Sequence, residues 1–185
     1  MFKSIIVAAA IVAAFAVTPV AAAEWSLGSH LELATLQSDV RGSGSSTLVT
    51  WPSNTFGYQP GLRVAVGDTR HANELTLDSG LFAIDEAGSS LTLFSAFAAW
   101  QHAFRAANAN APFANIGMGL YREGGAAYAA TAASYGAGIG MRHRIHDGRG
   151  DVRAEVRVDH LRGVKRLDRP ELTSIGLRLG FDLWI

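Results

Sequence analysis

The chain contains no cysteine among its 185 residues. Disulfide scaffolds and the metal sites built from cysteine thiolates are therefore excluded. Lysine is nearly as scarce, because Lys3 and Lys165 are the only lysines and the other basic residues are arginines. Charged residues make up 17% of the chain, whereas ~25% is typical of soluble proteins. Because arginine suits confined pairs with carboxylates and lysine suits solvated surfaces, this bias favours charges held in an interior.

The formal net charge is zero, so the composition gives no reason to expect a nucleic-acid partner. After the N-terminal segment there is no run with a convincing helical period. The chain consists instead of alternating polar and apolar runs, broken by glycine, asparagine, aspartate and proline. This pattern predicts an all-β protein.

The first 23 residues have the pattern of a secretory signal. Lys3 supplies a positive start, Ile5–Val17 is an uncharged apolar run, and Ala21–Ala23 is a small-residue cleavage motif. The alternative is a retained membrane anchor, but the apolar run is short for a spanning helix. We expect residues 1–23 to be removed, and residues 24–185 to form one domain.

The last eleven residues show the strand pattern most clearly. Ile175, Leu177 and Leu179 alternate with Gly176, Arg178 and Gly180, and such a strand is long enough to cross a bilayer when tilted. Seven further segments alternate in a similar way, although Ser90–His102 is apolar on both faces and its orientation stays open. The eight predicted strands are Trp25–Thr35, Phe56–Gly67, Glu74–Ile84, Ser90–His102, Phe113–Arg122, Ser134–Arg144, Asp151–His160 and Ile175–Ile185. An even number of antiparallel strands fits an up-and-down transmembrane β-barrel.

The connections between these strands also alternate in length. Leu36–Thr55 and the charged Leu161–Glu171 are long, whereas Asp68–His71 and His146–Gly150 are short. Long outer loops and short periplasmic turns are the usual asymmetry of such barrels. The short connection Asp85–Gly88 neither supports nor breaks the pattern.

Alternation alone does not say which face is outside, because a soluble lipocalin-like carrier has the same pattern turned inside out. The polar face is rich in glycine and arginine and carries both signs of charge, which suits a narrow, filled lumen. Tyr135 lies near a strand end on the apolar face, as an interfacial aromatic would. We therefore expect the apolar face to contact lipid. An eight-stranded interior is filled by side chains, so no wide pore is expected. The predicted structural charge network comprises Glu32, Arg63, Arg142, Arg144, Arg153, Glu155, Arg157, Asp159, Arg178 and Asp182.

Several motifs in the second half carry a family resemblance. Pro112–Leu120, Ser134–Met141 and the Arg153–Arg157 run resemble consecutive strands of the small OmpA/OmpX-like outer-membrane barrels. The resemblance covers Phe113 to Ile185 well and implies an eight-stranded monomer in the outer membrane, inserted by the barrel-assembly machinery. It also implies a role in envelope integrity, adhesion or surface binding. One departure is Ile185, because such barrels often end in Phe or Trp.

A narrower resemblance is to the lipid A 3-O-deacylase barrels, whose pattern is His-x-Ser followed by an acid. His160 occupies the place of the catalytic histidine, but Arg162 stands where the nucleophilic serine would be. Glu171 is a candidate acid and Ser174 a distant candidate hydroxyl. Without a hydroxyl beside an oriented base, ester hydrolysis has no attacking group. The structural barrel is therefore the favoured interpretation, and a membrane hydrolase is the alternative.

The last connection is basic, with Arg162, Lys165, Arg166 and Arg169. Guanidinium and ammonium groups bind phosphate well, so this loop is expected to touch the phosphates of lipopolysaccharide. The loop Leu36–Thr55 is the other candidate binding surface. Outer-membrane lipid and lipopolysaccharide are thus the predicted partners. No cofactor and no metal site are predicted.

Overall fold

The computed structural model describes residues 23–40, 44–50, 61–68, 72–86, 89–125, 128–145, 149–164 and 170–185. Their strands are β1 (Ala23–Ser38), β2 (Ser46–Thr50), β3 (Gly61–Asp68), β4 (Asn73–Glu86), β5 (Ser89–Ala103), β6 (Asn110–Gly125), β7 (Ala129–Ile145), β8 (Gly150–Leu161) and β9 (Leu172–Trp184). The described residues include no helix long and apolar enough to cross a membrane. The signal predicted for residues 1–23 lies outside the described residues except for Ala23, the first residue of β1.

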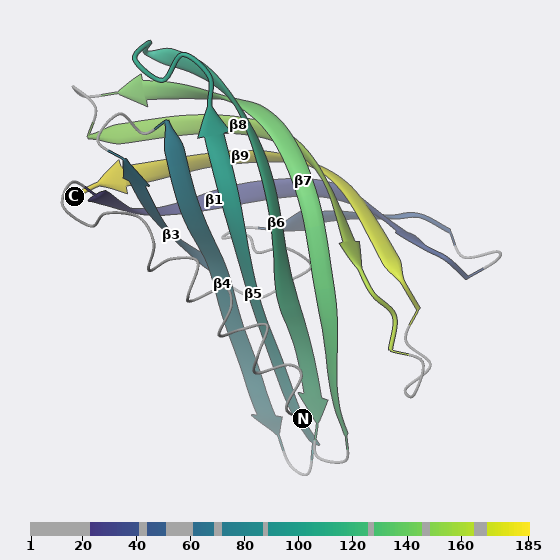
Figure 1. The fold of residues 1–185 in the computed structure, drawn as a ribbon. Helices are drawn as coiled ribbons and strands as arrows, with labels where there is room; N and C mark the ends of the chain where they lie inside the picture. The colour runs from purple at the N-terminus through teal and green to yellow at the C-terminus, as the bar shows by residue number, and fades with distance from the viewer. Residues whose placement is uncertain are drawn as a thin grey trace.

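The strands form one closed sheet (Figure 1). Consecutive strands from β3 to β9 pair antiparallel, and β9 pairs with β1 from Ser26↔Trp184 to Ser38↔Leu172. β2 and β3 share the second position, because β2 pairs with the C-terminal half of β1 and β3 with its N-terminal half. The chain is therefore a closed eight-stranded antiparallel β-barrel, as the alternation predicts.

The two ends of the barrel differ. At one end, here called the terminal end, lie Ala23, Ile185 and the connections β3–β4, β5–β6 and β7–β8. At the other, the loop end, lie the connections β1–β2, β4–β5, β6–β7 and β8–β9. Figure 1 shows the C-terminus at the opposite end from the points where β4 and β6 end.

The first connection is shorter than the sequence suggests. β1 continues to Ser38, and Ser46–Thr50 pairs with Glu32–Leu36 as β2. The predicted binding loop Leu36–Thr55 is therefore largely strand where it is described, because pairing satisfies backbone groups that a loop would leave to solvent. Residues 51–60, which include the start of the predicted strand Phe56–Gly67, lie outside the described residues.

Apolar side chains face outward along the strands. On β8, for example, Val152 is 48% and Val156 52% exposed, whereas Arg153 and Arg157, which directly follow them, are buried. The structure also settles the orientation of Ser90–His102: Phe97 is 1% exposed and Trp100 50% exposed, so Phe97 points inward and Trp100 outward. This arrangement is the reverse of a lipocalin-like carrier, whose apolar side chains line the interior.

Inward-facing glycines make room for these interior side chains. A Cβ added to Gly117 would lie 2.5 Å from the Cε1 atom of Phe97 and against the Ala98 carbonyl. A Cβ on Gly136 would collide with the carboxylate of Asp159 on the neighbouring strand. The glycine stripes on β6 and β7 therefore mark close approach of large side chains from adjacent strands.

A small apolar cluster lies inside the barrel at the terminal end. Ala103, Ala106, Ala111 and Phe113 form a buried cluster there. The turn that carries Ala106 contains Arg105, which has a positive φ of 57°. Interior charges lie at the same level, because Ala111 is opposite Arg142 on β7, and Arg144 is opposite Asp151 nearer the terminal end.

Candidate functional site

The ten residues of the predicted charge network all point into the barrel. Nine are buried, with exposed fractions from 1% to 6%, and Arg144 has a side chain 24% exposed. They come from β1, β3, β7, β8 and β9. Burial on this scale requires each charge to be paired, because an isolated ion in a low-dielectric interior is strongly destabilising.

Two residues connect most of the strands. Asp182 on β9 lies 3.3 Å from the Nε atom of Arg63 and 2.8 Å from that of Arg153. Arg178, which is four residues before Asp182 on β9, lies 3.0 Å from the Glu32 carboxylate and 3.6 Å from that of Asp159. Strand β9 is thereby tied to β1, β3 and β8 by charge as well as by its backbone.

Arg157 holds a second part of the network. Its guanidinium donates to the Asp159 carboxylate at 2.6 and 2.7 Å and to Glu155 at 3.0 Å. The same group lies 5.0 Å from the centroid of the Phe97 ring, within cation–π range. Two-point donation to one carboxylate fixes the orientation of the guanidinium as well as its charge.

Some interior residues were missed in the sequence. Glu74 pairs with Arg142 and accepts a hydrogen bond from Gln101 at 2.9 Å. Asp151 accepts from the indole of Trp184 at 2.8 Å. Strand alternation could have identified both, because residues two apart on a strand point to the same face. Asp151 is two residues before Arg153, and Glu74 is two residues before Thr76. Further buried polar side chains are His30, Asp78 and Asn115.

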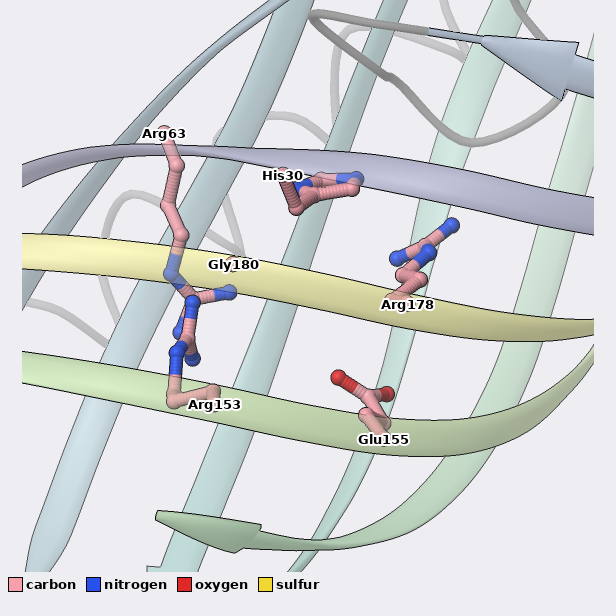
Figure 2. A pocket seen from close by; sticks show the side chains of 6 residues that line it. All are labelled: His30, Arg63, Arg153, Glu155, Arg178 and Gly180. Atoms are coloured by element: carbon pink, nitrogen blue, oxygen red, sulfur yellow. The ribbon is translucent and has the colours of Figure 1, made fainter. Parts of the chain in front are cut away.

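A small cavity lies inside this network (Figure 2). Its volume is about 10 Å³, and it is lined by His30, Arg63, Arg153, Glu155, Arg178 and Gly180. Figure 2 shows the guanidinium groups of Arg63 and Arg153 close together, with His30 and Arg178 across the space. A cavity of this size holds about one water molecule. The interior therefore has no chamber for an organic ligand at this position.

Of the three candidate catalytic residues, His160 and Glu171 lie together and Ser174 lies apart from them. Ser174 is 4% exposed and faces the interior, opposite Asp159. His160 faces outward and is opposite Thr173, whose hydroxyl lies 3.2 Å from its Nδ1 atom. The Nε2 atom lies 3.6 Å from the Glu171 carboxylate. The hydroxyl beside His160 is thus that of Thr173, which the sequence did not single out.

The surroundings of His160 are those of a polar rim. The ring packs against Tyr135, with centroids 4.9 Å apart, and Tyr135 is 52% exposed. In the next outward row toward the terminal end, Val158 and Ile175 are apolar. In the described ranges, no group of three or more histidines and carboxylates is placed to hold a metal ion.

Of the predicted basic loop, Arg162 is described and exposed. Its backbone N–H donates to the Ala133 carbonyl at 2.9 Å, which holds this residue beside β7 at the loop end. Lys165, Arg166 and Arg169 lie outside the described residues.

These features define a small eight-stranded barrel with charged residues inside and apolar residues outside, which is the architecture of the small outer-membrane barrels. The structure of Neisserial surface protein A is similar to this chain, with a TM-score of 0.59 and 14% identity over 86% of this chain and 96% of that one. OprG from Pseudomonas aeruginosa aligns over 89% of this chain and 96% of its own, with a TM-score of 0.46 and 11% identity. Ail from Yersinia pestis aligns over 88% and 99%, with a TM-score of 0.39 and 10% identity. At 14% identity, the similarity to Neisserial surface protein A concerns the fold alone. No protein-family model and no curated protein sequence matches the chain.

Proposed function

We propose that the protein is an outer-membrane β-barrel with a filled polar interior, which acts as a structural or surface-interaction protein and not as a pore. The observation that carries this proposal is the combination of paired interior charges with an apolar outer face. In hydrocarbon, a sheet must be closed so that every backbone group is paired. The β1–β9 pairing supplies that closure.

The interior supports a non-conducting role. Side chains from different strands meet inside it, as in the pairs Arg178–Glu32 and Arg63–Asp182. The cavity beside His30 holds about one water molecule, which is too little for a hydrated ion to pass. An eight-stranded wall has a diameter that side chains can fill.

The first test is location and conductance. We expect the protein to fractionate with outer membranes, to require detergent for release, and to migrate differently in unboiled and boiled gel samples. After reconstitution into planar bilayers it should give no steady conductance. Recovery from the periplasm without detergent would contradict the membrane assignment, and stepwise channel currents would contradict the filled interior.

We propose further that the basic loop contacts lipopolysaccharide. The exposed position of Arg162 at the loop end supports this role, and arginine is well suited to phosphate because it can donate two parallel hydrogen bonds. Replacing Arg162, Lys165, Arg166 and Arg169 with serine should weaken binding of purified lipopolysaccharide, and unchanged binding would reject this contact.

A second candidate function is lipid-ester hydrolysis, and one observation favours it. The hydroxyl of Thr173, the imidazole of His160 and the carboxylate of Glu171 lie in series on the outer face. This order is that of a nucleophile, a base and an orienting acid. If the protein is such an enzyme, it should release fatty acid from lipid A, and His160→Ala and Thr173→Val should each abolish release while Ser174→Ala does not. If the barrel is structural, no fatty acid should be released above the protein-free rate.

A further inference from the structure

The outer face of the barrel carries a groove that the functions above do not use. It lies across β4, β5, β6 and β7 near the loop end, with a volume of about 410 Å³. The residues that line it include Leu81, Phe94, Arg122, Gly124 and Ala129. Figure 1 shows these four strands side by side.

The strand register explains why a hollow forms here. Leu81, Phe94 and Arg122 lie opposite one another in one row across three strands. The next row toward the loop end contains Thr92, Gly124 and Ala129, which are small. A Cβ on Gly124 would meet only the Tyr128 carbonyl, at 3.8 Å. Large side chains in one row beside small ones in the next leave a depression on the surface.

Two of the side chains that line the groove are apolar and exposed. Leu81 is 63% exposed and Phe94 39% exposed. Both belong to the outward face that we assign to lipid. Contact with a lipid acyl chain keeps the apolar surface of these side chains out of water. Exposing that surface to water would be unfavourable.

Beside Phe94 in the same row lies Arg122, which brings a positive charge to the groove. Arg122 is exposed, and no carboxylate in the described part of the chain pairs with it. The adjacent Glu123 has the opposite parity on β6 and accepts a hydrogen bond from the Tyr128 hydroxyl at 2.7 Å. The guanidinium of Arg122 is therefore available to an anion from outside the protein.

The position of Arg122 along β6 identifies the level of that anion. The outward residues before it, from Ala114 to Leu120, are apolar or small, so Arg122 is the first charge beyond the hydrocarbon-facing stretch. On the next two strands, β7 and β8, Tyr135 and His160 also mark a change from apolar to polar, with Tyr135 opposite Met118 of β6. Lipid phosphates lie at this boundary, and arginine binds phosphate through paired, charge-assisted hydrogen bonds.

We propose that this groove binds the phosphorylated acyl-sugar part of lipopolysaccharide, with Arg122 on a phosphate and with Leu81 and Phe94 against an acyl chain. The proposal rests on the outer-membrane function above, because the loop end then faces the leaflet that holds this lipid. A volume of about 410 Å³ lies within the usual range of ~300–1,000 Å³ for ligand sites, so the groove accommodates one headgroup phosphate and the adjoining part of a chain.

The test measures binding of purified lipopolysaccharide to the full-length barrel in detergent. We expect Arg122→Gln to weaken binding about tenfold, since charge-assisted hydrogen bonds to phosphate are lost. The affinity of Arg122→Lys should lie between those of Arg122→Gln and the parent protein. Phe94→Ala should weaken binding of the acylated lipid but not of its deacylated, phosphorylated sugar. Arg149→Gln is the matched control, because Arg149 is an exposed arginine at the terminal end and its loss should leave affinity unchanged.

Two results would overturn the proposal. One is an Arg122→Gln variant that binds as tightly as the parent protein. The other is equal binding of phosphatidylglycerol, which would assign the groove to phospholipid. The serine variant of the basic loop separates the two sites: loss of binding there, with Arg122→Gln unchanged, would retain the loop contact and reject the groove. Failure of the proposed function is distinguished by fractionation, which does not depend on Arg122.

Discussion

Replacement of Asp182 with asparagine is expected to destabilise the barrel by about 3–5 kcal/mol, the usual cost of breaking a buried ion pair by removing one partner. Asp182 is 1% exposed and lies against both Arg63 and Arg153. The amide keeps the size of the carboxylate but leaves two buried guanidinium groups with less compensating charge. The free energy of unfolding, measured by urea titration in lipid vesicles, should show this loss.

Two variants make the result specific to the interior pair. Glu171→Gln removes a carboxylate whose side chain is 48% exposed, and exposed pairs contribute only about 0–1 kcal/mol. The double variant Arg153→Met with Asp182→Leu should lose less stability than the sum of the two single variants, because it removes partners together. An Asp182→Asn protein as stable as Glu171→Gln would show that the interior charges do not depend on pairing.

Replacement of Val156 with arginine is expected to reduce stability in lipid by about 2–4 kcal/mol, the cost of a basic residue on the lipid face near the bilayer midplane. Val156 is 52% exposed on β8 and lies between the outward residues Ile139 and Leu177 of the neighbouring strands. The folded fraction after refolding into vesicles, read from unboiled gel samples, measures the effect.

The control for this substitution lies at the loop end. Gln37 is an exposed outward residue near the end of β1, and Gln37→Arg should cost about 0–1 kcal/mol, as at a membrane interface. A depth-dependent cost requires hydrocarbon around the middle of the barrel. Equal effects at Val156 and Gln37 would instead place the apolar stripe in water and reject the membrane assignment.

Alternation was sufficient to predict most of the barrel, because the two faces of β7, β8 and β9 differ strongly in polarity. It did not orient β5, where both faces are apolar. Phe97 could be placed inside only from its neighbours, since the space above Gly117 and the guanidinium of Arg157 both depend on how strands pair. Alternation also missed β2, whose five residues follow a stretch of glycine and serine that is typical of a loop.

The polar group around His160 shows a different limit. Thr173 and Ser174 are adjacent in the sequence and almost equally far from His160. A shift of one residue along a strand, however, moves a side chain to the other face. Only the register His160↔Thr173 decides which hydroxyl lies beside the imidazole. The groove beside Arg122 also depends on register, because its residues come from four strands and form no motif in the chain.

The partners of Arg178 have a consequence for how the protein reaches its folded state. Its guanidinium contacts Glu32, which is 146 residues away along the chain, and also Asp78 and Asp159 on two further strands. A partly assembled sheet without the β1–β9 seam would present these charges and two unpaired strand edges to the bilayer interior. Insertion one hairpin at a time is therefore strongly disfavoured, and the barrel is expected to enter the membrane in a single concerted step with its seam already forming.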